Sequence, residues 1–170
     1  LHTRGNWKMT DLTTQTLLDR AEISDVFHRY ALGVDTRDWG MFRSCFTDDV
    51  VADFTSLWPG VVIRGADEWV AVAQSAVNGL DATQHIITNH SHDIQGDTAK
   101  CTSYLQAQHV FKNDLGGDQN VIAGYYTYDM LRTTDGWRIK NYSLTVTWTT
   151  GNAGIWELAA ERLKARAAAE

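Results

Sequence analysis

Residues 121–149 read VIAGYYTYDMLRTTDGWRIKNYSLTVTWT, and this stretch decides the fold class. Two runs rich in β-branched and aromatic residues, Val121–Thr133 and Trp137–Thr149, flank the dipeptide Asp135-Gly136. Such runs favour β-strands, and Asp-Gly is typical of tight hairpin turns. We therefore expect two long antiparallel strands joined by a hairpin.

The same pattern precedes this segment. Thr83–Ile94 and Ala99–Lys112 are also β-rich runs, separated by Gly96-Asp97, and Gly116-Gly117-Asp118 leads into the stretch quoted above. Four such runs in chain order predict a meander of four long antiparallel strands. Long twisted strands tend to curl, so we expect a concave face that can hold a pocket.

The first half of the chain shows helical periodicity instead. Ile23, Phe27, Tyr30 and Val34 recur at steps of four, three and four within Thr14–Val34, which predicts a helix with one apolar face. Gly33 weakens that helix near its expected end. Further elements are expected in chain order: a helix over Trp39–Phe46 with Asp38 as N-cap, a strand around Val50–Phe54, a turn at Trp58-Pro59-Gly60, a helix over Ala66–Leu80 and a C-terminal helix over Ala153–Ala169.

Length and charge narrow the function classes. The 170 residues suit one domain, which we place at 11–170 behind a disordered leader at 1–10, with Met9 as a possible native start. The net charge of −6 and the lack of any basic run argue against a nucleic-acid partner. No stretch predicts a signal peptide or a membrane span, so we expect a cytoplasmic protein with Cys45 and Cys101 as buried thiols.

Three residues stand out as able to carry acid–base chemistry. Asp35 follows the apolar stripe of the first helix, His85 lies in the first long strand and His109 lies in the next one. The simpler interpretations are a helix-end aspartate and half-buried histidines bonded to backbone carbonyls. In an antiparallel pair, the numbers of any two residues that lie directly opposite have a constant sum. For His85 opposite His109 this sum is 194, which a three-residue connection would produce. A two-residue turn at Gly96-Asp97 gives 193 and puts the two rings on opposite faces.

Metal and cofactor motifs are not evident. His90 and His92 form an H-x-H pair on one strand, but His85 has the opposite parity and no third ligand is suitably spaced. We interpret the pair as solvent-side histidines and expect no metal. There is no GxSxG, P-loop or GxGxxG motif, so we expect no organic cofactor either.

The order of elements, with Tyr30, Asp35 and His85 in these places, resembles the nuclear-transport-factor-2-like superfamily, particularly its SnoaL-like members, over about 17–148. Asp35-Thr36-Arg37-Asp38-Trp39, Thr83-Gln84-His85 and Gln108-His109 are similar to the catalytic stretches of scytalone dehydratase. The dyad formed by Asp35 and His85 also resembles that of hexachlorocyclohexane dehydrochlorinase, and the spacing of Tyr30 resembles that of bile-acid 7α-dehydratases. This chain departs from the dehydratase at Val34 and Phe54, where that enzyme has tyrosines.

The resemblance implies a cone-shaped α+β fold, in which three N-terminal helices and a C-terminal helix accompany a curved antiparallel sheet. It implies a cofactor-independent lyase, a dehydratase before a dehydrohalogenase, acting on a hydrophobic cyclic or polycyclic molecule. In that interpretation His85 abstracts a proton and Asp35 orients the His85 ring. His109 or Tyr30 then protonates, or donates a hydrogen bond to, the departing or carbonyl oxygen. A ketosteroid-type isomerase or polyketide cyclase, and a non-catalytic ligand-binding or dioxygenase small-subunit-like protein, are the alternatives.

The aromatic residues suggest where the substrate and other chains bind. Aromatic side chains make up 11% of the chain, which suits an apolar pocket. We expect the substrate to contact these six side chains: Phe54, Trp58, Trp69, Tyr125, Thr127 and Trp148. Tyr126, Tyr128 and Met130 then lie on the outer face of the sheet, which predicts a homo-oligomer, either a dimer or a trimer.

Overall fold

The computed structural model describes residues 12–169, so the leader expected over 1–10 lies outside the described residues. The elements follow one another as α1 (Thr14–Thr36), α2 (Trp39–Arg43), β1 (Phe46–Asp53), β2 (Val62–Arg64), α3 (Ala66–Val77), β3 (Ala82–Gln95), β4 (Thr98–Val110), β5 (Gln119–Thr133), β6 (Gly136–Gly151) and α4 (Ile155–Ala167). The expected α+β class is confirmed. The three-residue strand β2 was missed because it is too short to show a period.

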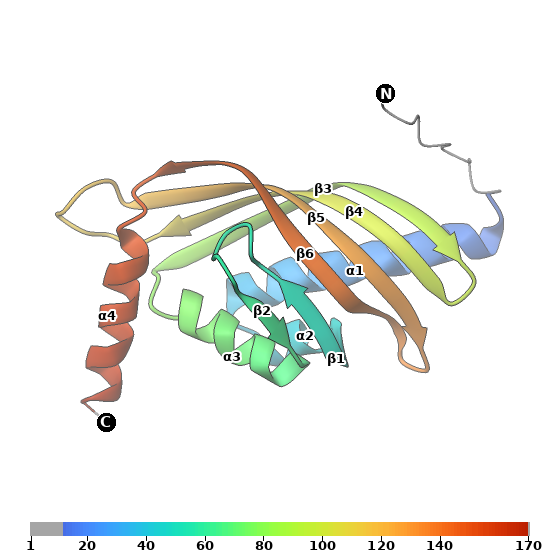
Figure 1. The fold of residues 1–170 in the computed structure, drawn as a ribbon, viewed down its shortest axis with the longest axis horizontal. Coiled ribbons are helices and arrows are strands. Elements are labelled where there is room, and N and C mark those ends of the chain that lie inside the picture. Colours follow the sequence, from blue (N-terminus) through green and yellow to red (C-terminus); the bar gives the residue numbers. More distant parts are fainter. Residues whose placement is uncertain (1–11, 170) are drawn as a thin grey trace.

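The six strands form one curved, unclosed sheet in the order β2-β1-β6-β5-β4-β3, and α1 runs along its concave side (Figure 1). The predicted meander β3–β6 is antiparallel throughout. β1, however, lies parallel to β6, so the sheet is not antiparallel everywhere. Among the described residues, no helix is long and apolar enough to cross a membrane.

Helix α1 supplies the apolar layer that the sheet wraps around. Thr13 caps its start: its hydroxyl accepts the backbone N–H of Thr16, whose own side chain accepts the N–H of Thr13. The predicted stripe Ile23, Phe27, Tyr30 and Val34 is buried. Phe27 stacks on Tyr128 of β5 with the ring centroids 4.2 Å apart, which ties the helix to the middle of the sheet.

Gly33 has a packing role and does not end the helix, which continues to Thr36. A Cβ atom at this position would lie 2.8 Å from the backbone nitrogen of Phe42 in α2. The missing side chain therefore lets α2 approach α1 closely. Asp38 caps α2 as expected, because its side chain accepts the N–H of Met41.

The register of β3 against β4 contains a β-bulge. The hairpin has the two-residue turn, with Gln95 opposite Thr98, but two residues, Asn89 and His90, then face one residue of β4. Asn89 has a φ of 56°, as an extra residue at a bulge can require. Beyond the bulge His85 lies opposite Ala107 and Thr83 lies opposite His109, so neither expected pairing of His85 is correct. Both histidines nevertheless share the inner face.

The face of β5 that meets the helices is the opposite of the expected one. Tyr126, Tyr128 and Met130 are buried in the core, whereas Tyr125 and Thr127 are on the outer face. Large apolar side chains occur on both faces of this strand, so periodicity could not choose between them. The hydroxyl of Tyr126, 3.2 Å from that of Tyr30 in α1, marks the inward face.

Gly33→Ala should destabilise the protein even though alanine is the better helix former. The added Cβ would meet the backbone of Phe42, and such overpacking costs about 1–3 kcal/mol of unfolding free energy. Gly40→Ala is the matched control, because a Cβ there meets only the side chain of Asp38, at 3.5 Å. Thermal and urea unfolding should show a loss for Gly33→Ala and no loss for Gly40→Ala. Equal stabilities would contradict the close helix contact.

Candidate active site

A small apolar pocket lies between α1, α3, α4 and the concave face of the sheet. It encloses about 60 Å³ and is lined mainly by aromatic and aliphatic side chains, with Tyr30, His85, His109 and Tyr126 among them. The four come from α1, β3, β4 and β5. The fold therefore gathers the few polar groups of an otherwise apolar pocket from four separate elements.

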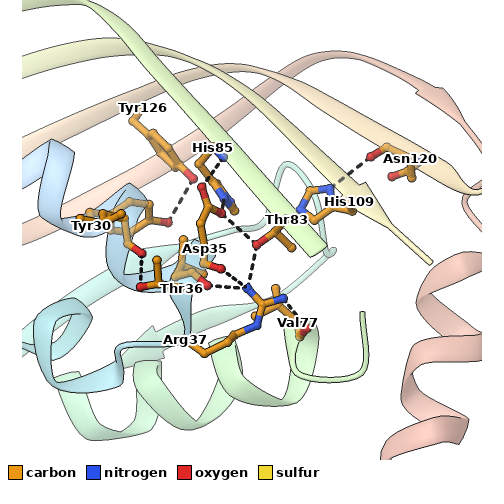
Figure 2. A network of polar contacts seen from close by, with 12 residues as sticks. Tyr30, Asp35, Thr36, Arg37, Val77, Thr83, His85, His109, Asn120 and Tyr126 are labelled. Carbon is orange, nitrogen blue, oxygen red and sulfur yellow. Dashed lines mark hydrogen bonds and ion pairs between the residues drawn. The ribbon is translucent and has the colours of Figure 1, made fainter. Parts of the chain in front are cut away.

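Asp35, in the last turn of α1, holds His85 by two contacts. One carboxylate oxygen of Asp35 accepts the backbone N–H of His85 at 2.7 Å, and the other lies 2.7 Å from His85 Nδ1 (Figure 2). The hydroxyl of Thr83 donates to that second oxygen at 2.9 Å. Burial raises the pKa of Asp35, but the hydrogen bonds and charge of His85, together with Thr83, outweigh it and hold the pKa below its ordinary value. Asp35 is therefore an ionised acceptor.

This contact decides which nitrogen of His85 is free. Because an ionised carboxylate can only accept, Nδ1 of His85 carries the proton. The lone pair of a neutral ring is then on Nε2, on the edge away from Asp35. The side chain is only 9% exposed, and the ring lines the pocket, so this lone pair is available to a molecule bound there.

Arg37 clamps the segment that carries Asp35. It ends α1 in a left-handed conformation with a φ of 62°. Its guanidinium donates to the carbonyls of Val34 at 2.6 Å and Val77 at 3.0 Å, and to the hydroxyl of Thr83 at 2.8 Å (Figure 2). It thus joins the carboxyl ends of α1 and α3 to the start of β3, and its charge faces Asp35 through Thr83.

His109 is close to His85, with the ring centroids 5.7 Å apart. Its Nδ1 lies 3.3 Å from the carbonyl oxygen of Asn120, which can only accept, so Nδ1 carries the proton. Burial, and then the neighbouring His85, lower the pKa of His109 to about 3. His109 is therefore neutral near pH 7 and presents an acceptor nitrogen, which does not suit it to protonate a leaving group.

A pair of buried tyrosines completes the polar lining. The hydroxyls of Tyr30 and Tyr126 are 3.2 Å apart, and burial raises the pKa of both. One hydroxyl donates to the other, which leaves the second proton of the pair for another acceptor. The Tyr30 ring packs edge-on to the His85 ring with the centroids 6.4 Å apart, so the tyrosine pair lines the same pocket as the candidate base.

The predicted substrate contacts divide into two groups. Phe54, Trp58 and Trp69 line the pocket, and their role in binding stays a prediction. Tyr125, Thr127 and Trp148 lie on the outer face, so their placement in the pocket was wrong. For Trp148 the reason is a second bulge: Ala123 pairs with Trp148 but Gly124 pairs with Val146, which reverses the parity of the end of β6.

His90 and His92 are not solvent-side residues as expected. Both face α1 because the two-residue turn places His92 opposite the buried Cys101, and the hydroxyl of Ser24 lies 3.0 Å from His90 Nδ1 and 3.2 Å from His92 Nε2. Over residues 12–169, no group of three His, Cys, Asp or Glu side chains is arranged to hold a metal ion.

Several contributors to the site were not anticipated. Thr83 and Arg37 lie inside the quoted motifs, but their contacts depend on how three elements meet. Trp156 of α4 lines the pocket with its ring 4.4 Å from His109, and its indole N–H donates to the side-chain oxygen of Asn120 at 3.1 Å. The sequence predicted only a helix over Ala153–Ala169 here and gave no sign of these partners.

The sequence model of the SnoaL-like domain family matches residues 15–143, which are most of the chain. The chain belongs to the SnoaL-like family. Terrestric acid biosynthesis cluster protein E of Penicillium crustosum is 28% identical over 149 residues, which cover 84% of this chain and 92% of that protein.

Two solved structures share the fold. One, from Novosphingobium aromaticivorans, is assigned as a scytalone dehydratase and has a TM-score of 0.74 at 18% identity, covering 83% of this chain and 92% of that one. The other is the hexachlorocyclohexane dehydrochlorinase LinA-type3 of Novosphingobium barchaimii, with a TM-score of 0.69 at 20% identity, covering 82% and 93%. At these identities the likeness shows the nuclear-transport-factor-2-like fold.

The protonation of His109 can be measured directly. Long-range ¹H–¹⁵N spectra of the histidine rings should show His109 as the neutral tautomer with the proton on Nδ1, both at pH 7 and at pH 5, because burial disfavours its charged form. His28, with a side chain 62% exposed, is the internal comparison. An imidazolium pattern for His109 at pH 5, or a proton on Nε2 at pH 7, would contradict the arrangement.

Proposed function

We propose that this protein is a cofactor-independent lyase of the dehydratase type that acts on a hydrophobic ring molecule. His85 is its general base, and Asp35 is the residue that orients it. The observation that carries the proposal is the 2.7 Å contact between Asp35 and His85 Nδ1 behind an apolar pocket. The SnoaL-like family, whose structural neighbours include a dehydratase and a dehydrochlorinase, supports a lyase or isomerase type of reaction.

The proposed step needs one base and one hydrogen-bond donor. Nε2 of His85 takes a proton from a carbon next to a carbonyl group, and the Tyr30–Tyr126 pair donates a hydrogen bond to the carbonyl oxygen as negative charge develops there. The imidazolium of His85, stabilised by Asp35, then returns the proton to a neighbouring hydroxyl. The C–O bond breaks, a C=C bond forms and water leaves.

His109 has a different role in this proposal from the one that the resemblance implied. As a neutral acceptor it receives a hydrogen bond from a substrate N–H or O–H group and does not protonate the leaving oxygen. Tyr30, with Tyr126, donates the hydrogen bond to the carbonyl oxygen. The site residues in this proposal are therefore His85, Asp35, Tyr30, Tyr126 and His109.

An isomerase or cyclase is the second candidate. The same base and tyrosine pair would form an enolate, and return of the proton to another carbon would give an isomer of equal mass. The non-catalytic alternative is a protein that only binds a ligand in the same pocket. The pocket encloses about 60 Å³, whereas sites for drug-sized ligands usually enclose about 300–1,000 Å³. A ring molecule, as substrate or as ligand, therefore requires the pocket to widen.

Replacing His85 should strongly reduce turnover while the fold remains. For His85→Gln we expect a fall in kcat of about 10²–10⁴-fold, the usual contribution of a general base, and a smaller fall for Asp35→Asn. Cyclic β-hydroxy ketones and β,γ-unsaturated ketones are the substrates to compare, because dehydration releases water and isomerisation conserves mass. His28→Gln replaces an exposed histidine and is the control. An unchanged rate in His85→Gln would refute the mechanism.

We also propose that the chain self-associates through the outer face of the sheet. Ile86, Tyr104, Tyr125 and Trp148 lie together there, and they are 42%, 60%, 36% and 49% exposed. Neighbouring strands bring them together, since Tyr104 pairs with Tyr125. Exposed apolar patches of this kind are typical of protein–protein interfaces.

Tyr104→Glu should shift the protein toward the monomer, because it places a charge in the middle of this patch. Light scattering after size-exclusion chromatography measures the mass, and it distinguishes a dimer from a trimer in the wild type. Gln95→Glu adds the same charge at the exposed hairpin and should leave the mass unchanged. A wild-type protein that is monomeric at all concentrations would overturn this proposal.

A further inference from the structure

Trp69 is a pocket residue with an unused hydrogen-bond donor. It lies in α3 and is 4% exposed, and its ring packs 4.7 Å from that of Phe54, 6.0 Å from that of Phe42 and 6.0 Å from that of Tyr142. Its side chain lines the same pocket as His85. Within the described part of the chain, its buried Nε1 has no hydrogen-bond partner.

Two other tryptophans do have an acceptor for the same group. The indole N–H of Trp156 donates to the side chain of Asn120 at 3.1 Å, and that of Trp137 reaches Asp19 at 3.5 Å. A buried donor without an acceptor destabilises a fold, and native proteins contain few of them. At the edge of a pocket, an acceptor on a bound molecule accounts for such a donor.

The other polar groups of the pocket indicate which hydrogen-bond donors and acceptors a bound molecule needs. His85 and His109 present acceptor nitrogens, and the Tyr30–Tyr126 pair presents one hydroxyl proton. Trp69 has different neighbours from His109, which packs against Trp156. Trp69 thus adds a second donor, separate from the tyrosine pair, to the side chains that line the pocket near Phe54.

We propose that Trp69 Nε1–H binds an oxygen of the substrate, so that the pocket accepts an oxygenated ring molecule in preference to a halogenated hydrocarbon. This inference rests on the proposed function and deepens it, since it concerns the substrate class of the same site. A carbonyl or hydroxyl oxygen accepts a hydrogen bond from an indole, whereas a carbon-bound halogen is a poor acceptor. Trp69 is a binding residue in this proposal and takes no part in the proton transfer.

The test observes the indole proton of Trp69 directly. The seven tryptophans give seven indole signals in a ¹H–¹⁵N spectrum, and the signal of Trp69 is the one missing from Trp69→Phe. Cyclohexanone and chlorocyclohexane serve as probes, because they share a six-membered ring and differ in the acceptor. We expect cyclohexanone to move the Trp69 indole proton downfield, as hydrogen bonding does, and chlorocyclohexane to leave it without such a shift.

Affinity measurements add a matched control. Trp69→Phe should weaken the binding of cyclohexanone relative to chlorocyclohexane by about three- to tenfold, the equivalent of one neutral hydrogen bond. Trp58→Phe removes a similar ring from the same pocket and should affect both probes alike. Equal effects on both probes in Trp69→Phe would overturn the proposal. So would an unmoved Trp69 indole signal with cyclohexanone at its solubility limit.

Failure of the proposed function is distinguishable from failure of this inference. Asp35→Asn and His85→Gln leave Trp69 unchanged, so the downfield shift with cyclohexanone should persist in both variants. A persistent shift in a protein that turns over no ketone would leave the oxygen site standing and refute the lyase. Turnover without any shift of the Trp69 signal would refute the oxygen site alone.

Discussion

The β-bulge at Asn89 is the constraint on which the site depends. By placing one extra residue in β3, it reverses the parity of that strand while β4 alternates without interruption. As a result His85, His90 and His92 all face the helices, although their numbers differ in parity. Without the bulge, the two-residue hairpin turn would send His85 to the outer face, away from Asp35 and from His109.

Once His85 faces inward, the end of α1 determines its chemistry. Asp35 accepts both the backbone N–H and the ring N–H of the same residue, so the position and the tautomer of His85 are set together. Thr83 and Arg37 hold Asp35 from the other side, and Arg37 reaches across to the end of α3. Because these contacts join α1, α3 and β3, the His85 ring is held only as rigidly as those three elements pack together.

Helix α4 packs beside the pocket through a contact even closer than the one between α1 and α2. A Cβ at Gly79 would lie 2.1 Å from the carbonyl oxygen of Ala159, so glycine lets α4 rest against the end of α3 (Figure 1). Arg162 then donates to the carbonyl of Gly79 and to Asp81. This docking brings Trp156 against His109 at the edge of the pocket. A ring substrate of the proposed kind would require the pocket to widen.

The sequence by itself determined the α+β class, the four-strand meander and the buried stripe of α1, because periodicity and turn chemistry are local properties. Asp35 and His85 were singled out by residue type and by the family resemblance, and the structure brings them into contact. Only the tertiary structure decided which face of β5 is inside, where β3 and β6 bulge and which aromatic residues line the pocket. Tyr125 and Tyr126 are adjacent and both aromatic, so nothing local distinguishes them. A bulge changes parity without leaving a mark in the hydrophobic pattern, and the partners of Trp69, His109 and Arg37 depend on contacts between elements far apart in the chain.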